Sequence, residues 1–147
     1  MRSLETAPLR DGATYEAQIM WVSATGNASD WSPLTTFLAV ADQTAPAAPT
    51  LSSLALVSGY VTGTLSVPDD DHAYRAIVQV DTDPAFGSPD TAYGPKVIVP
   101  GSTVTLSVGP YADGTYYFRG RLTNRSGVAS PWSAAEAIVI DTSGGGP

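Results

Sequence analysis

The chain repeats a short pattern of residues at a fixed offset of 101 positions. Three pairs of landmark residues keep this offset: Tyr15 and Tyr116, Gly26 and Gly127, and Trp31 and Trp132. A repeat constrains the whole fold, because each copy forms the same supersecondary unit. A period of about 100 residues is the length of one β-sandwich domain. With 147 residues, the chain holds one period and part of a second.

Each copy alternates apolar and polar residues with a period of two, which indicates β-strands. The alternating run covers Tyr116 to Thr123 in the second copy and Tyr15 to Val22 in the first. The turn-rich sequences NRSGVASP and ATGNASD follow these runs. Residues 134–140 and 34–40 then predict returning strands. Each copy is therefore expected to form a strand, a loop and a second strand.

Four further runs between the copies predict strands: residues 60–67, 74–81, 96–99 and 103–108. One face of each of the first two runs is apolar, formed by Val61, Leu65 and Val67 in the first and by Tyr74, Ala76, Val78 and Val80 in the second. The proline-rich segment 41–50 predicts a stiff linker or an edge strand, because proline cannot donate to a sheet ladder. Several short strands separated by turns, without a sustained helical period, predict an all-β sandwich.

Residues 44–141 resemble a known family in four places: TAPAAPTL, YRAIVQVDTDPAFGSP, DGTYYFRGRLTNRSG and ASPWS. These sequences are similar to those of a fibronectin type III domain of the bacterial or phage tail kind, as in host-specificity and tail-fibre proteins. The resemblance implies an immunoglobulin-like β-sandwich. It also implies that Tyr116 takes the tyrosine-corner position, where a tyrosine hydroxyl pins the strand crossing.

We therefore expect a complete module over residues 44–141. A partial module, holding the last two or three strands, is expected over residues 1–43, and a flexible tail over residues 142–147. An isolated two-stranded hairpin is marginal in water. Residues 1–43 are thus either a piece of a longer chain or a hairpin that another subunit completes, and the sequence leaves both alternatives open.

The charge balance limits the classes of partner that the chain is expected to bind. Fourteen acidic and seven basic residues give a net charge of -7, and the sequence shows no basic stripe. We expect no nucleic-acid binding, because such proteins neutralise phosphates with basic residues. We expect no membrane insertion, since no apolar run approaches the roughly 18 residues of a spanning helix. The absence of cysteine excludes disulfides, thiolate metal sites and a cysteine nucleophile.

The Asp69-Asp70-Asp71-His72 sequence is the densest group of ionisable residues. Ca²⁺ needs six or more converging oxygens, whereas consecutive residues point in different directions. We interpret this segment as a solvated turn and leave open whether it binds a cation. His72 is the only histidine, and no G-x-S-x-G sequence accompanies it. We predict no enzyme activity, no cofactor, and no catalytic, cofactor-binding or metal-ligating residues.

Arg119 and Arg121 lie on one outward face of their predicted strand, and Trp132 begins the neighbouring strand. This arrangement predicts a cation–π stack. The first copy replaces the two arginines by Gln18 and Met20 but keeps its tryptophan. Because the tryptophan does not depend on arginine partners, a packing role is favoured over a sugar-binding role.

The leading hypothesis is a non-enzymatic structural or adhesion module of a phage or prophage-like tail, which mediates subunit assembly or host-surface contact. The expected partners are other virion subunits, further copies of the chain through residues 1–43, and a host-surface glycan or protein. The expected location is the virion tail or the extracellular space. The alternative is an accessory spacer or carbohydrate-binding module of a secreted bacterial polysaccharide-degrading enzyme.

Overall fold

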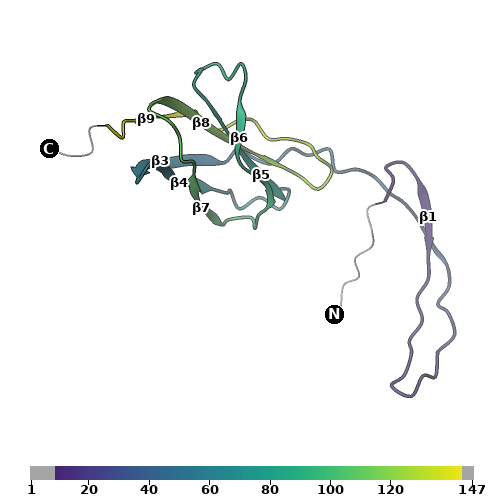
Figure 1. Cartoon of the computed structure of the whole chain (residues 1–147). Coiled ribbons are helices and arrows are strands. Elements are labelled where there is room, and N and C mark those ends of the chain that lie inside the picture. The colour runs from purple at the N-terminus through teal and green to yellow at the C-terminus, as the bar shows by residue number, and fades with distance from the viewer. Residues whose placement is uncertain (1–8, 144–147) are drawn as a thin grey trace. The chain divides into compact units, whose positions relative to one another are not determined.

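The computed structural model describes residues 9–143, and all of their regular structure is β-strand (Figure 1). The chain divides into two compact units, unit 1 (Met1–Ala41) and unit 2 (Asp42–Pro147). In the described part, no helix is long and apolar enough to cross a membrane. The predicted division into a partial module over residues 1–43, a complete one over 44–141 and a tail over 142–147 stays a prediction. Residues 1–8 and 144–147 lie outside the described part.

Unit 2 is a sandwich of two antiparallel sheets (Figure 1). The first has the order β3-β4-β7, from β3 (Thr50–Val57), β4 (Tyr60–Ser66) and β7 (Thr103–Val108). The second has the order β6-β5-β8-β9, from β6 (Asp90–Val97), β5 (Arg75–Asp81), β8 (Gly114–Thr123) and β9 (Glu136–Ile140). The all-β immunoglobulin-like class predicted from the sequence is confirmed.

Alternating residues of both sheets form the core of unit 2. Leu65 of β4 and Phe118 and Leu122 of β8 are completely buried. The predicted apolar faces of two strands are confirmed for Val61, Leu65, Val67, Ala76, Val78 and Val80, which are buried. Tyr74, which was predicted on the same face, precedes β5 and is only half-buried. Each large side chain buried in this way contributes about 1.5–3 kcal/mol to folding.

The sequence did not predict β3. The register of β3 on β4 shifts between Ser52 and Ala55, and Ser53 has a φ of 58°. This bulge moves the core-facing position by one residue, so that Leu51 faces the core before it and Leu54 packs on the core after it. The apolar residues therefore do not alternate along the strand, which hides it from a search for a period of two.

The predicted strand over residues 96–99 is wrong in its extent, because β6 begins at Asp90 and ends at Val97. Pro95 lies inside it. β6 is the edge strand of its sheet, where a residue without an N–H group costs no ladder hydrogen bond. The proline therefore marks an edge strand rather than the end of a turn.

Unit 1 contains one two-stranded antiparallel sheet among its described residues, formed by β1 (Thr14–Ala17) and β2 (Thr35–Leu38) (Figure 1). Thr14 pairs with Leu38, and Ala17 pairs with Thr35. β1 is shorter than the predicted run from Tyr15 to Val22. Beyond it, separate backbone hydrogen bonds and serine side chains hold the chain instead of a continuous ladder.

Candidate functional site

The β1–β2 hairpin of unit 1 and the β8–β9 hairpin of unit 2 share one register. Tyr15 pairs with Phe37, and Tyr116, 101 residues later, pairs with Ile138, again 101 residues later. The turns also match, since Gly26 donates to the carbonyl of Ser23 and Gly127 to that of Asn124. The offset seen in the sequence is thus kept, residue by residue, in the backbone hydrogen bonds.

A pair of serines three residues apart holds each hairpin beyond the ladder. In unit 2, Leu122 N donates to Ser130 Oγ at 2.9 Å, and Gly120 N donates to Ser133 Oγ at 2.9 Å. In unit 1, Trp21 N donates to Ser29 Oγ at 2.9 Å. In the same unit, Ile19 N donates to Ser32 Oγ at 2.8 Å. The hydroxyls accept from amides that have no ladder partner, which satisfies the backbone where the strands separate.

Ser32 and Ser133 belong to the repeated sequence, but no role was predicted for these serines. The signal was present, because Ser29 and Ser130 keep the offset of 101, as do Ser32 and Ser133. Serine is common in turns, so a serine in a turn indicates little by itself. Its recurrence at equivalent positions of both copies is what indicates a shared structural role.

The two hairpins differ in what covers them. Leu122 is 0% exposed, whereas its equivalent in unit 1, Trp21, is 71% exposed. Gly120 is buried, whereas its equivalent Ile19 is 41% exposed. We name the side of the unit 1 hairpin that corresponds to the core side of β8–β9 the hairpin face, and it consists of Tyr15, Ala17, Ile19, Trp21 and Phe37. A cluster of exposed large apolar side chains is typical of an interaction surface.

The tyrosine-corner bond forms in unit 1 and not at Tyr116. The hydroxyl of Tyr15 accepts a hydrogen bond from Arg10 N at 2.9 Å. Among residues 9–143, Tyr116 makes no equivalent bond, so the role predicted for it is wrong. Tyr111 takes the position equivalent to Arg10, and its ring packs on Tyr116 with the ring centroids 5.1 Å apart. The backbone amide of Tyr111, which is equivalent to that of Arg10, donates instead to the carbonyl of Gly59 at 3.4 Å.

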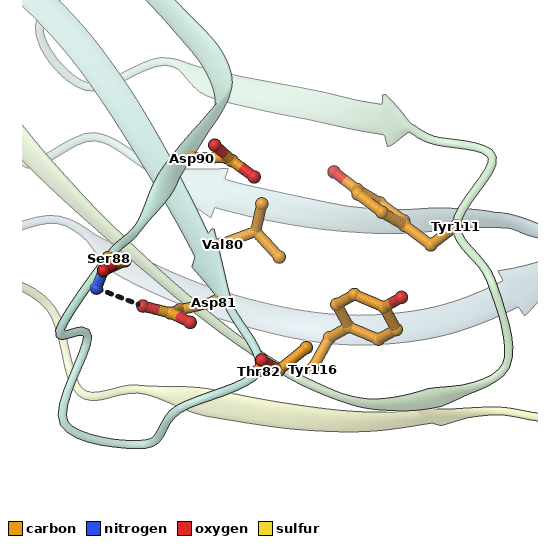
Figure 2. Close-up of a pocket in the computed structure, with 7 residues that line it drawn as sticks. All are labelled: Val80, Asp81, Thr82, Ser88, Asp90, Tyr111 and Tyr116. Carbon is orange, nitrogen blue, oxygen red and sulfur yellow. Dashed lines mark hydrogen bonds between the residues drawn. The ribbon is translucent and has the colours of Figure 1, made fainter.

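Tyr111 and Tyr116 line a cavity of about 390 Å³ at one end of the sandwich, which Figure 2 shows. The other lining residues are Val80, Asp81, Thr82, Ser88 and Asp90. Asp81 accepts hydrogen bonds from Ser88 N and Asp83 N, both at 3.0 Å, and these bonds lower its pKa. Burial, and to a lesser extent Asp90, raises the pKa of Tyr111. Asp81 thus holds the loop backbone with both of its carboxylate oxygens.

The Asp69–His72 segment is a hydrogen-bonded turn. The carboxylate of Asp70 accepts from His72 N at 2.9 Å and from Ala47 N at 2.8 Å, and these bonds lower its pKa. His72 Nδ1 lies 2.6 Å from Asp42 Oδ2. This contact raises the pKa of His72 and lowers that of Asp42. Within residues 9–143, no three His, Cys, Asp or Glu side chains gather as a metal site.

The predicted cation–π stack is confirmed. The guanidinium carbons of Arg119 and Arg121 lie 4.1 Å and 4.4 Å from the Trp132 ring centroid. Arg119 also lies 4.1 Å from the ring centroid of Phe86. Burial, and secondly the neighbouring charge of Arg121, lowers the pKa of Arg119. Two guanidinium groups thus cover the indole of Trp132.

No protein-family model matches the chain, and no curated protein sequence matches it. Its similar solved structures include the PKD domain of an M14-like peptidase from Thermoplasmatales archaeon SCGC AB-540-F20. That domain is 17% identical with a TM-score of 0.47, and the match covers 69% of this chain and 100% of that one.

A second similar structure contains the FN1–FN3 domains of chicken CNTN1, at 12% identity and a TM-score of 0.55. The match covers 91% of this chain and 44% of that chain, so the protein spans less than half of its length. At this level of identity the likeness concerns the fold. The chain is an immunoglobulin-like β-sandwich similar to fibronectin type III domains, and its assignment to the phage-tail kind stays a prediction.

Proposed function

We propose that this chain is a non-enzymatic structural module of a phage or prophage-like tail, and that unit 1 joins it to neighbouring subunits. The observation that carries the proposal is the exposed hairpin face, whose equivalents in unit 2 belong to a sandwich core. The tail assignment is supported by the sequence resemblance of residues 44–141.

The energetics favour covering the hairpin face. An exposed two-stranded sheet is marginal in water, because it needs a third strand or a packed face for stability. The most exposed side chains of this face are Ile19, Trp21 and Phe37. Burying each of them against a partner contributes about 1.5–3 kcal/mol. Assembly thus supplies the stability that unit 1 lacks among its described residues.

The partner we propose is the hairpin face of a further copy. Exchange of hairpins between the two units is disfavoured, because Ile19 would enter the space of Gly120 and Trp21 that of Leu122. A methyl group added at Gly120 would already lie 2.8 Å from Leu65 Cδ1. Overpacking a core in this way costs about 1–3 kcal/mol. Copies are therefore expected to join face to face, with unit 2 intact.

The test compares residues 1–147 with residues 42–147 by size-exclusion chromatography with light scattering. Unit 2 contains its own core, so the shorter chain is expected to be a folded monomer. The full chain is expected to form a dimer or larger assembly that dissociates on dilution. A full chain that stays monomeric at every concentration, with rapidly exchanging amides in unit 1, would contradict the proposal.

The alternative of a carbohydrate-binding module relies on an exposed aromatic platform in unit 2. Trp132 does not supply one, because Arg119 and Arg121 lie over its ring. We therefore propose assembly as the function.

A further inference from the structure

Four arginines lie together on the outer face of the β6-β5-β8-β9 sheet or at its margin: Arg75, Arg119, Arg121 and Arg125. We call this group the arginine stripe. The inward residues Phe118 and Leu122 are buried, so Arg119 and Arg121, which alternate with them on β8, face outward. Arg125 follows the end of β8 by two residues.

The strand pairing makes the stripe continuous. Arg121 is opposite Ile77, and Arg75 is opposite Thr123, so that Arg75 is the diagonal neighbour of Arg121. Alternate residues of one strand and diagonal neighbours across a pair are both separated by about 7 Å. Arg125 adjoins Arg75, because both guanidinium groups lie over the ring of Tyr74.

Within residues 9–143, no carboxylate forms an ion pair with the stripe, although the charge of Asp81 acts on Arg119. The single ion pair in this described part joins His72 to Asp42. Arg119 donates from Nε and Nη2 to Gln79 Oε1, which is neutral. Arg121 Nε is buried and has no hydrogen-bond partner. Four of the seven basic residues of a chain with net charge -7 thus share one face.

An aromatic ring lies beneath each of these guanidinium groups. Arg119 and Arg121 lie over Trp132, whereas Arg75 and Arg125 lie 5.2 Å and 4.4 Å from the ring centroid of Tyr74. Stacking orders a guanidinium group and leaves N–H donors at its edge, which match carboxylate and sulfate oxygens. The donors of the stripe are thus ordered before any ligand arrives.

We propose that the arginine stripe binds an extended acidic polysaccharide, with its carboxylate or sulfate groups against the guanidinium edges. A neutral sugar would stack on a free aromatic face, whereas two guanidinium groups already lie over the indole of Trp132. Single-stranded nucleic acid also needs free aromatic faces for its bases. A polysaccharide with regularly spaced anionic groups can bind through the guanidinium N–H donors and the positive charge of the stripe alone. This inference is independent of the proposed assembly through unit 1.

The arginine stripe could not be recognised in the sequence, from which we expected no basic stripe. The sequence shows no basic stripe because Arg75 and Arg121 lie 46 positions apart, and the pairing of β5 with β8 brings them together. The expectation of no nucleic-acid binding stays a prediction, which now rests on the covered rings and the net charge.

The experiment is a calorimetric titration of the full chain with polygalacturonate at low ionic strength, with neutral dextran as the reference polymer. The test variant is R75Q/R125Q, because both side chains are exposed and stack on Tyr74 alone. The matched control is R10Q, which makes the same change of residue in unit 1. Thermal unfolding followed by circular dichroism checks that each variant is folded.

Polygalacturonate is expected to bind and dextran is not, and binding is expected to weaken as salt is added. R75Q/R125Q is expected to weaken binding about 4- to 25-fold, since each exposed ion pair contributes about two- to fivefold. R10Q is expected to leave the affinity unchanged. Substituting Arg121→Lys, which keeps the charge but loses the planar fork, is expected to weaken binding less than Arg121→Gln.

Three results would overturn the proposal. The first is a failure of polygalacturonate to bind at low ionic strength. The second is a loss of affinity in R10Q as large as the loss per substitution in R75Q/R125Q, because binding would then follow net charge rather than the stripe. The third is tighter binding of the single-stranded DNA oligo(dT), because the face would then belong to a nucleic-acid-binding class.

Discussion

The β1–β2 hairpin and the β8–β9 hairpin share one hydrogen-bond register and differ in burial. In both, two serines accept hydrogen bonds from the backbone amides at equivalent positions. In unit 2 the face of the hairpin forms part of a core, whereas in unit 1 Trp21 is 71% exposed.

The comparison separates two contributions to the stability of a strand pair: bonds within the hairpin and packing against other strands. Turn glycines and the serine pairs lie within the hairpin itself, so they can form the same bonds in either unit. The stability of β8–β9 comes in addition from β3, β4 and β7, which lie elsewhere in the chain. Substitutions at matched positions are therefore expected to have large effects in unit 2 and small ones in unit 1.

The largest difference is expected between Leu122→Ala and Trp21→Ala. Leu122 is completely buried, so its truncation is expected to lower the free energy of unfolding by about 2–5 kcal/mol. Trp21→Ala is expected to change it by less than about 0.5 kcal/mol in a dilute monomer. Urea denaturation followed by far-UV circular dichroism measures both. Equal losses would mean that the hairpin face is already covered within one chain.

The next difference concerns Gly120→Ala and Ile19→Ala. The added methyl group would lie 2.8 Å from Leu65 Cδ1, and rearranging the core around it is expected to cost about 1–3 kcal/mol. Ile19→Ala is expected to cost less than about 0.5 kcal/mol, since its side chain is 41% exposed. The same denaturation experiment applies. A stable Gly120→Ala variant would show that hairpin exchange between units is open after all.

A comparable or smaller loss is expected when a serine of the pair is removed. Ser133→Ala deprives the buried amide of Gly120 of its acceptor and is expected to cost about 1–3 kcal/mol. Ser32→Ala is expected to cost about 0.5 kcal/mol or less, because water can reach the exposed amide of Ile19. Hydrogen exchange at both amides checks the assignment. Unchanged protection of Gly120 in Ser133→Ala would mean that another group accepts its proton.

The smallest effect concerns His72, whose pKa the contact with Asp42 raises above 6.5. Its contribution to stability is complete below the unfolded pKa of about 6.5 and is lost as the pH rises through the folded pKa. Asp42 has a lowered pKa, so its contribution is present above 3.8 and is lost as the pH falls through the folded value. The ion pair therefore stabilises the fold between the folded pKa of Asp42 and the folded pKa of His72.

An NMR titration of the His72 ring measures this effect. Asp42→Asn is expected to lower the pKa of His72 toward 6.5. The matched control Asp71→Asn is expected to lower it less, since Asp71 is the smallest of its acidic influences. A pKa that is the same in all three proteins would exclude the Asp42 contact in solution.

The strands with clean alternation were predicted from the sequence, whereas β3 was missed and β6 was predicted only at its end. β4, β5 and β8 each present every second residue to the core, so a period of two identifies them. β3 contains a bulge and β6 contains Pro95, and each of these removes the local signal. Which strands pair depends on residues far apart in sequence, so periodicity alone does not give it.

The candidate sites were predicted to different degrees. The stack of Arg119, Arg121 and Trp132 followed from local alternation and neighbouring strands. The arginine stripe did not, because it also needs Arg75 from another strand. The role of Tyr116 was carried over from a family pattern. It does not hold, because the amide that would bond its hydroxyl, that of Tyr111, donates to the carbonyl of Gly59. The hairpin face required a comparison of burial between the two copies.

The most direct test of the central claim is hydrogen exchange by NMR at two equivalent amides, Trp21 and Leu122. Both donate to a serine hydroxyl at 2.9 Å, so their local bonds are matched. We predict that Leu122 exchanges only through global unfolding, whereas Trp21 exchanges rapidly in a dilute monomer and slowly where the chain self-associates. Equal protection of the two amides in the dilute monomer would contradict the account, because the unit 1 hairpin would then be stable without a partner.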